Sequence, residues 1–162
     1  MSHIARNLLV AALVCGVLPS FASAGQVADS SAVRAAALKF AGGVAWRADT
    51  VIASDFSCTG KVQQAILGAL PDEILVAIFT HGLDQPPEVL RFDAGDRNIL
   101  ASKIRVDDYA MSVAEIAGVS GAAPVGYRQS TTCHGVRLSD DSSEAAHIYW
   151  DHDHQRFDSW AQ

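Results

Sequence analysis

The sequence predicts an α+β fold, mainly an antiparallel sheet of meander hairpins, with one N-terminal amphipathic helix and one disulfide. Three observations support this prediction. Apolar residues recur at helical spacing early in the chain, short strand-like segments separated by turn residues fill the remainder, and two cysteines follow an apparent export signal. A chain of this length without an internal linker is expected to form one domain.

The first 24 residues have the organisation of a secretory signal peptide. Arg6 stands in a segment without acids, the run Leu8 to Leu18 is apolar, and Ala22-Ser23-Ala24 supplies a cleavage site of small residues. The apolar run is too short to span a bilayer. We therefore expect cleavage after Ala24 and a single periplasmic or secreted domain over residues 25–162 that does not insert into the membrane.

The charge of the expected mature chain limits its partners. It holds eleven basic and all eighteen acidic residues, which gives a formal net charge of −7. This balance argues against nucleic acid and anionic membrane surfaces as partners. The acidity serves solubility in the simplest interpretation, and recognition of a basic partner is the alternative.

Signal cleavage removes Cys15 and leaves Cys58 and Cys133 as the remaining cysteines. Exported proteins fold in oxidising surroundings, so these two are expected to form a disulfide. Closing so long a loop would stabilise the fold by roughly 4 kcal/mol in the chain-entropy model. Two free buried thiols are the alternative.

Local patterns assign most of the secondary structure. Residues 29–40 read as a helix that covers one face of the sheet and stops at Gly42-Gly43. The run Ile74 to Phe79 is the most apolar of the mature chain, which favours a central strand covered on both faces. Residues 111–116 fit either a strand or a helical turn, and 118–124 read as a loop. The other expected strands lie within 44–46, 50–53, 62–67, 89–92, 99–109, 127–133, 135–138, 146–150 and 156–160.

The loop after residue 54 has the outline of a calcium site. Asp55, Ser57, Thr59 and Gln63 occupy positions one, three, five and nine, with Gly60 at six, a spacing that lets alternate side chains converge on one cation. Only Asp55 is a carboxylate, so any calcium affinity is expected to be weak. The alternative is a tight turn in which Asp55 and Ser57 hydrogen-bond backbone N–H groups.

Residues 51–67 resemble an FG-GAP or integrin-α-type repeat, in which a strand leads into an Asp-x-Asp-x-Asp-Gly-x-x-Asp calcium loop and an apolar strand follows. The resemblance implies that Asp55, Ser57, Thr59 and Gln63 are side-chain ligands and that the Lys61 carbonyl is a backbone ligand. It does not extend to a propeller, because the chain has room for about two blades. The wider layout also resembles small exported bacterial proteins with a late Cys-x-Gly, here residues 133–135, and a C-terminal aromatic hairpin.

Three further groups were considered as sites. His152 and His154, in an Asp-His-Asp-His run, are metal-ligand types, although such a run is typical of a solvated turn and of adventitious metal binding. His81 with Asp84 could supply a general base. Cys133 and His134 are adjacent on an expected strand, so their side chains should point to opposite faces and should not form a catalytic dyad.

Catalytic signatures are missing from the sequence, which contains no Gly-x-Ser-x-Gly, no His-Glu-x-x-His and no phosphate-binding glycine loop. We therefore expect a non-enzymatic exported module, of an inhibitor or immunity type, that binds another protein. Trp150 and Trp160 are its interface candidates, with core packing as their alternative. A calcium-binding module using residues 55–63 and a hydrolase with a spatially assembled site are the alternative functions, calcium is the sole cofactor considered, and the oligomeric state is not indicated.

Overall fold

A computed structural model describes residues 29–95, 98–140 and 144–161; the expected signal peptide lies outside this range. Two helices and eight strands follow one another along the chain. They are α1 (Ser30–Phe40), β1 (Ala45–Ser54), β2 (Gln63–Ala69), β3 (Glu73–Phe79), β4 (Glu88–Asp93), β5 (Lys103–Asp108), α2 (Val113–Ser120), β6 (His134–Ser139), β7 (Ala146–Asp151) and β8 (Arg156–Ala161).

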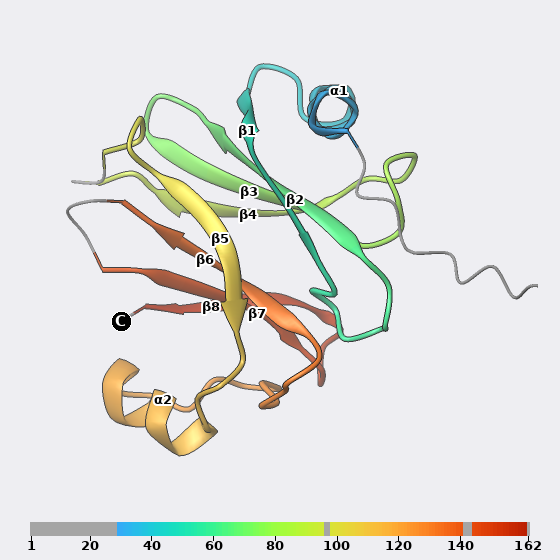
Figure 1. The fold of residues 1–162 in the computed structure, drawn as a ribbon. Helices are drawn as coiled ribbons and strands as arrows, with labels where there is room; N and C mark the ends of the chain where they lie inside the picture. The colour runs from blue at the N-terminus through green and yellow to red at the C-terminus, as the bar shows by residue number, and fades with distance from the viewer. Residues whose placement is uncertain (1–28, 96–97, 141–143, 162) are drawn as a thin grey trace, which may run out of the picture.

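The strands form two antiparallel meanders that pack face to face. The first sheet, sheet A, has the order β1-β2-β3-β4, and the second, sheet B, has the order β5-β6-β7-β8. In Figure 1, α1 lies on the outer side of sheet A and α2 lies at the opposite end of the molecule, beyond sheet B. The predicted fold class, mainly antiparallel sheet with helix and one disulfide, is confirmed.

Alternation along the strands builds the core between the sheets. Ile74, Val76 and Ile78 of β3 point to one side and meet Val136 and Ile148 of sheet B, in a cluster that also includes the fully buried ring of Phe56. Side chains at every second position of a strand lie on one face of the sheet. A shift in strand pairing by one residue would turn these apolar side chains away from the core, so their burial fixes the register of both sheets.

The predicted central strand is β3, which is covered on both faces. Its other face presents Leu75, Ala77 and Phe79 to Val33 and Ala37 of α1. Asp29 caps this helix by accepting a hydrogen bond from the Ser31 backbone N–H at 3.1 Å. The helix therefore covers one face of sheet A, as expected.

The two strand segments expected at 44–46 and 50–53 form one strand, β1. Its pairing with β2 shifts register between Arg47 and Ile52, where the chain bulges. The Thr50 hydroxyl donates to the Arg47 carbonyl at 2.7 Å and accepts the Leu67 N–H at 3.1 Å, so it replaces ladder bonds that the bulge removes.

Two expectations for the middle of the chain are wrong. Residues 118–120, expected in a loop, belong to α2, which a Ser112–Glu115 capping box begins and Gly121, with φ of 78°, ends. Residues 127–133, expected as a strand, have no regular secondary structure and bend at Thr131 and Thr132. Here the Ser130 hydroxyl accepts the backbone N–H groups of Thr132 and Cys133, both at 3.1 Å, and so turns the chain out of an extended path.

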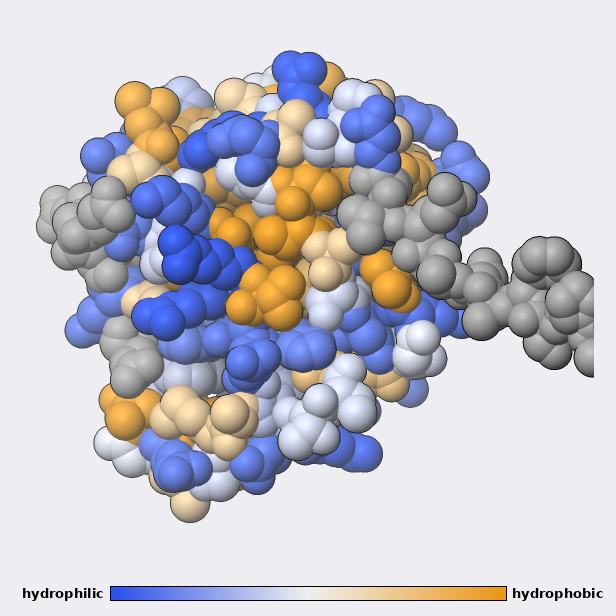
Figure 2. All heavy atoms as spheres, in the orientation of Figure 1, coloured by the Kyte–Doolittle hydropathy of each residue, from blue (hydrophilic) through white to orange (hydrophobic). Residues whose placement is uncertain are grey.

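In the part of the chain that the structure describes, no helix has the length and apolarity needed to cross a membrane. Figure 2 shows apolar side chains gathered in the middle of the face seen in Figure 1, between the first strands of the two sheets, with polar groups around them. The edge strands β1 and β5 approach each other on this side, and β4 approaches β8.

Candidate functional site

The loop expected to bind calcium is closed by its own hydrogen bonds. The Asp55 carboxylate accepts the Thr59 N–H at 2.9 Å and the Gly60 N–H at 2.6 Å. Gly60 has φ of 75°, the left-handed conformation that glycine adopts without steric cost. Both carboxylate oxygens of Asp55 are thus engaged with the backbone, as expected for the tight-turn alternative.

Gln63, the ninth loop position, points into the loop. Its side-chain oxygen accepts the Phe56 N–H at 3.0 Å and the Ser57 N–H at 2.9 Å, and its amide nitrogen donates to the Ser57 hydroxyl at 2.6 Å. Besides Asp55, the side chain that accepts backbone N–H groups in this turn is therefore Gln63, where the turn alternative expected Ser57. Among the described residues, no group of three or more His, Cys, Asp or Glu side chains is placed to hold a metal ion.

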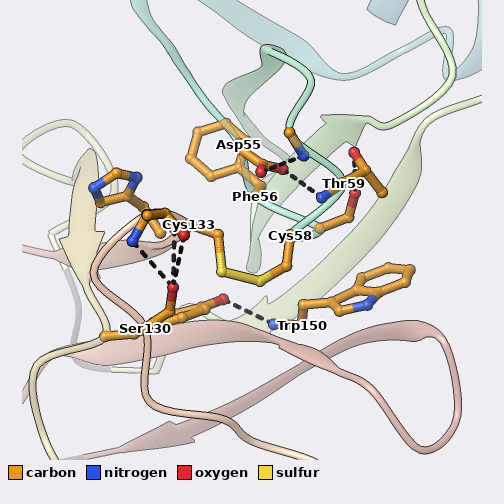
Figure 3. Close-up of a disulfide and its surroundings, with 12 residues drawn as sticks. Asp55, Phe56, Cys58, Thr59, Ser130, Cys133 and Trp150 are labelled. Atoms are coloured by element: carbon orange, nitrogen blue, oxygen red, sulfur yellow. Dashed lines mark hydrogen bonds between the residues drawn. A yellow bond between two sulfur atoms is a disulfide. The ribbon is translucent and has the colours of Figure 1, made fainter.

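The disulfide between Cys58 and Cys133 is confirmed, with the Cα atoms 5.0 Å apart. It joins the β1–β2 loop of sheet A to the residue before β6 of sheet B (Figure 3). The His134 N–H donates to the Asp55 carbonyl at 2.9 Å beside it. Cys58 has φ of 58°, a left-handed conformation that is strained for a residue with a side chain. The disulfide and the Asp55 bonds hold it there.

The Asp55→Ala substitution should separate the turn from an ion site. We expect it to lower the free energy of unfolding by about 1 to 2 kcal/mol, since two backbone N–H groups lose their acceptor. The loss should be equal in millimolar calcium and in chelator when measured by urea unfolding. Asp84→Ala, which removes an exposed acid elsewhere, is the control. A calcium-dependent gain in the wild type that Asp55→Ala abolishes would restore the calcium prediction.

The histidines proposed as adventitious metal ligands lie in the β7–β8 turn. His154 Nδ1 pairs with Asp151 Oδ2 at 2.5 Å, while Asp151 Oδ1 accepts the N–H groups of Asp153 and His154. Burial raises the pKa of Asp151, but the hydrogen bonds from His154 and Asp153 outweigh it, so the net pKa is lowered. Burial, followed by the charge of Arg128, lowers the pKa of His152. The hydrogen bonds that Asp151 accepts therefore stabilise the β7–β8 turn.

Several of the predicted residues meet at one open groove of about 420 Å³. Ser57, Thr59 and Gln63 line one part of it, and Trp150 and His152 line another. His81 also lines this groove and pairs with the Thr80 hydroxyl at 2.8 Å, whereas no hydrogen bond or ion pair to Asp84 is present among the described residues. The His81–Asp84 general-base prediction therefore has no geometric support.

The adjacent Cys133 and His134 do not form a pair. Cys133 is in the disulfide, and His134 Nδ1 contacts the Ser54 hydroxyl at 2.8 Å, with Asp108 3.7 Å from Nε2. Asp108 is too distant for a hydrogen bond. The Ser54 contact ties the end of β1 to the start of β6.

The tryptophans have different environments. Trp46 is buried against Gly68, Trp150 packs edge-on against Phe157 at 5.0 Å, and Trp160 is half-buried on the outer face of sheet B. Trp160 stacks on His147, with ring centroids 4.0 Å apart and planes within 6° of parallel. Of the two interface candidates, Trp160 is thus on an outer face and Trp150 is oriented toward the core.

The outer face of sheet B contains a buried histidine ring nitrogen without a hydrogen-bond partner among the described residues. His147 of β7 pairs through Nδ1 with Asp107 of β5 at 2.7 Å, and its side chain is only 10% exposed. A carboxylate can only accept, so in the neutral ring the proton resides on Nδ1 and Nε2 keeps a lone pair. Nε2 is buried and has no hydrogen-bond partner among the described residues. A buried acceptor without a donor costs about 1 to 3 kcal/mol.

Gly135 of β6 allows Asp107 of β5 and His147 of β7 to contact each other across the strand that separates them. It pairs with Asp107 in the sheet and carries no side chain, so residues of β5 and β7 can meet over it. A Cβ at this position would lie 2.7 Å from Cε1 of Tyr109, whose ring packs over the strand. The absence of a side chain at Gly135 therefore allows the Tyr109 ring to pack closely against β6.

A small cavity of about 50 Å³ adjoins His147. Its lining includes Asp107, Asp108 and His147. The remainder is aromatic and apolar: Tyr109, Met111, Tyr127, Ile148, Tyr149 and Trp160. The Asp107 carboxylate lies on this face beside His147, whereas the Asp108 carboxylate lies on the other face of β5, near His134. By volume the cavity accommodates only a few non-hydrogen atoms of a ligand.

The hydroxyl groups of the three tyrosines at the cavity each have a backbone hydrogen-bond partner. Tyr127 donates to the Met111 carbonyl at 2.8 Å and Tyr149 to the Val125 carbonyl at 3.1 Å, while Tyr109 accepts the Trp150 N–H. Burial, aided by Asp107 and Glu115, raises the pKa of Tyr127 to about 12. Burial, aided by Asp158 and Asp151, raises the pKa of Tyr149 to about 12.

A row of cationic and aromatic side chains crosses the same face. Arg105 pairs with Arg137, Arg137 with His147, and His147 with Trp160 on successive strands. Two like charges directly opposite one another destabilise a sheet. Within the described residues, neither arginine has an ion pair or hydrogen bond, and both are exposed. Their guanidinium groups are available to a ligand.

Sequence reasoning missed the Asp107–His147 pair, which is separated by 40 positions. The sequence feature that points to this pair is the alternation of core-facing and outward-facing residues in 103–108 and 146–150. It places four residues on the face opposite the core: Arg105, Asp107, His147 and Tyr149. Alternation alone gives no reason to bring β5 and β7 together across β6, because it does not give the order of the strands in the sheet. No family model matches this chain, and no significant match was found among curated proteins or solved structures.

Proposed function

We propose that this protein is an exported, non-enzymatic module that binds another protein through the outer face of sheet B around Trp160. The observation that carries the proposal is the Arg105–Arg137–His147–Trp160 row beside the small cavity. Trp, Tyr and Arg are the residue types that dominate protein interfaces, and hot spots sit next to pockets.

Both signs of charge occur on this face. The two free guanidinium groups lie on one side of His147, and the carboxylate of Asp107 lies beside its ring. Charges of both signs select one orientation of a partner and oppose others. This pattern favours a protein partner over a uniformly charged polymer.

The proposed export rests on the signal-like N-terminus and is supported by the disulfide, since disulfides persist in oxidising compartments. The alternative of a hydrolase would use His147 and Asp107 as a general base. Among the described residues that line the cavity there is no Ser, Thr or Cys to act as nucleophile, so its composition favours binding.

The test begins with crosslinking of the tagged protein in extracts of its own envelope and medium. The affinity of the captured partner is then measured for wild type, Trp160→Ala, Arg137→Ala and the control Leu38→Ala, which changes a partly exposed residue of α1. Trp160→Ala should weaken binding roughly thirtyfold, as expected for a hot-spot residue. Arg137→Ala, whose exposed side chain is not needed for folding, should weaken it several-fold.

Leu38→Ala should bind as wild type. Equal affinities for all four proteins, or no crosslinked partner in any extract, would overturn the proposal. Thermal unfolding of each variant separates a binding defect from a folding defect.

A further inference from the structure

We propose that Arg105 and Arg137, the arginine pair, together bind one carboxylate group of the partner protein, on an aspartate or glutamate side chain. This inference rests on the proposed binding function and specifies what the partner supplies at the same face. Arg105 lies on the edge strand β5 and Arg137 on its neighbour β6, directly opposite each other in the sheet (Figure 1). Ile104 and Val136 beside them point into the core, so both arginines point outward to solvent.

The arginine pair is unfavourable in the free protein. Residues directly opposite in an antiparallel pair have Cβ atoms about 4.5 to 5.5 Å apart, and like charges at these positions repel each other. Among the described residues, neither guanidinium group has a hydrogen bond or an ion pair that would offset this repulsion. An anion bound between the two groups would offset it, so the free energy that the pair costs in the free sheet is recovered on binding.

Two acidic residues near the arginine pair are engaged elsewhere. Asp107, two positions after Arg105 on the same face of β5, pairs with His147 at 2.7 Å. Asp140, which follows β6, accepts the Asn98 N–H at 2.9 Å. In the part of the chain that the structure describes, neither acid forms an ion pair with the arginine pair. The counter-charge is therefore left to a ligand.

Charge and geometry favour a carboxylate over a more highly charged anion. With the His147 ring neutral, the charge of Asp107 balances one guanidinium group and leaves one positive charge on this part of the face. A single carboxylate balances that charge, whereas a phosphate dianion would leave an excess of negative charge beside Asp107. Each carboxylate oxygen can accept from one guanidinium group, and such charge-assisted hydrogen bonds are stronger than neutral ones.

The neighbouring Trp160 strengthens this contact. An ion pair that is open to water contributes little to binding, because solvent screens it. Trp160 lies in the same row as Arg137, on the far side of His147. A partner that packs on Trp160 therefore shields the arginine pair from water. The net negative charge of the chain, −6, repels carboxylates from the remaining surface, so the arginine pair also orients the partner.

The test is an NMR titration of the protein with N-acetyl-glutamate methylamide, followed by the side-chain Nε–H signals of Arg105 and Arg137. We expect both signals to shift together with one roughly millimolar dissociation constant, since both guanidinium groups bind the same carboxylate. The glutamine derivative, which has the same shape without the charge, should bind at least tenfold more weakly. Inorganic phosphate should bind no more tightly than the glutamate derivative.

Three variants locate the binding. Arg105→Gln and Arg137→Gln should each weaken binding of the glutamate derivative roughly fivefold. Each should also unfold at the wild-type temperature or above it, because the repulsion within the arginine pair is removed. Lys61→Gln removes one positive charge at an exposed position of the β1–β2 loop and should leave binding unchanged. None of the three substitutions alters a buried residue, so all three proteins should fold as wild type.

Equal binding of the glutamate and glutamine derivatives, or tighter binding of phosphate, would overturn this inference. So would an equal effect of Arg137→Gln and Lys61→Gln. Conversion of the carboxyl groups of the captured partner to amides should weaken its binding at least tenfold relative to the untreated partner. A partner that is lost on Trp160→Ala but keeps its affinity after this conversion would leave the protein-binding function intact and remove the carboxylate contact. A saturable glutamate response without any crosslinked partner would instead remove the proposed function and leave the arginine pair as an anion site.

Discussion

Removing the disulfide is expected to lower the free energy of unfolding by about 4 kcal/mol. Cys58 and Cys133 are 75 positions apart, so their bond restricts the unfolded chain over much of its length. In the native state the same bond connects the β1–β2 loop of sheet A with the start of β6 in sheet B. The total stability of a domain is about 5 to 15 kcal/mol, so this loss is a large fraction of it.

The measurement is urea unfolding of the oxidised protein, the reduced protein and the Cys58→Ser/Cys133→Ser double variant. The reduced protein and the variant should coincide, which shows that the lost bond and not the new serine side chains causes the change. The thermal midpoint should fall by roughly 10 to 20 °C. A loss below about 1 kcal/mol would contradict this prediction and would mean that non-covalent contacts, such as those of His134 with Asp55 and Ser54, hold the two sheets without the disulfide.

Gly135→Ala is expected to destabilise the protein by about 3 kcal/mol or more. An added Cβ would lie 2.4 Å from the Ile148 carbonyl oxygen and 2.7 Å from Cε1 of Tyr109. Gly135 is on β6, between β5 and β7, so the carbonyl cannot retreat without disturbing the sheet. The Tyr109 ring would have to leave its place in the cavity wall.

Gly118→Ala is the matched control. It makes the same chemical change in α2, where no atom lies within 4 Å of the added carbon. Because alanine is the better helix former, it should stabilise the protein by up to about 1 kcal/mol. Chemical unfolding measures both variants, and near-UV circular dichroism reports the tyrosine environment. Wild-type stability of Gly135→Ala would contradict the described packing of β6.

Local patterns were sufficient for much of this fold. The helix at 30–40, the central strand at 73–79 and the C-terminal hairpin each depend on residues close together in sequence. The two cysteines that remain after the expected signal cleavage allow a single disulfide within the chain. The irregular conformation of residues 127–133 was not predicted, because the hydrogen bond to the Ser130 hydroxyl and the disulfide override the strand propensity of the apolar and β-branched residues in this segment. Tertiary contacts of this kind outweigh strand propensity.

The functional candidates were harder to predict than the fold. The Asp55 loop has the spacing of an ion site, yet its carboxylate and Gln63 satisfy the backbone directly. The cavity needs Asp107 and His147 from strands that are not neighbours, and Tyr109 and Tyr149 as well. Only the sheet order and the absence of a side chain at Gly135 bring these groups together.

The central claim is that Asp107 of β5 and His147 of β7 meet across Gly135, with the proton of the neutral His147 ring on Nδ1. Long-range ¹H–¹⁵N NMR correlation of the histidine rings measures this directly. With the ring neutral, we predict a protonated Nδ1 and an unprotonated Nε2. A neutral ring protonated on Nε2 would contradict the account.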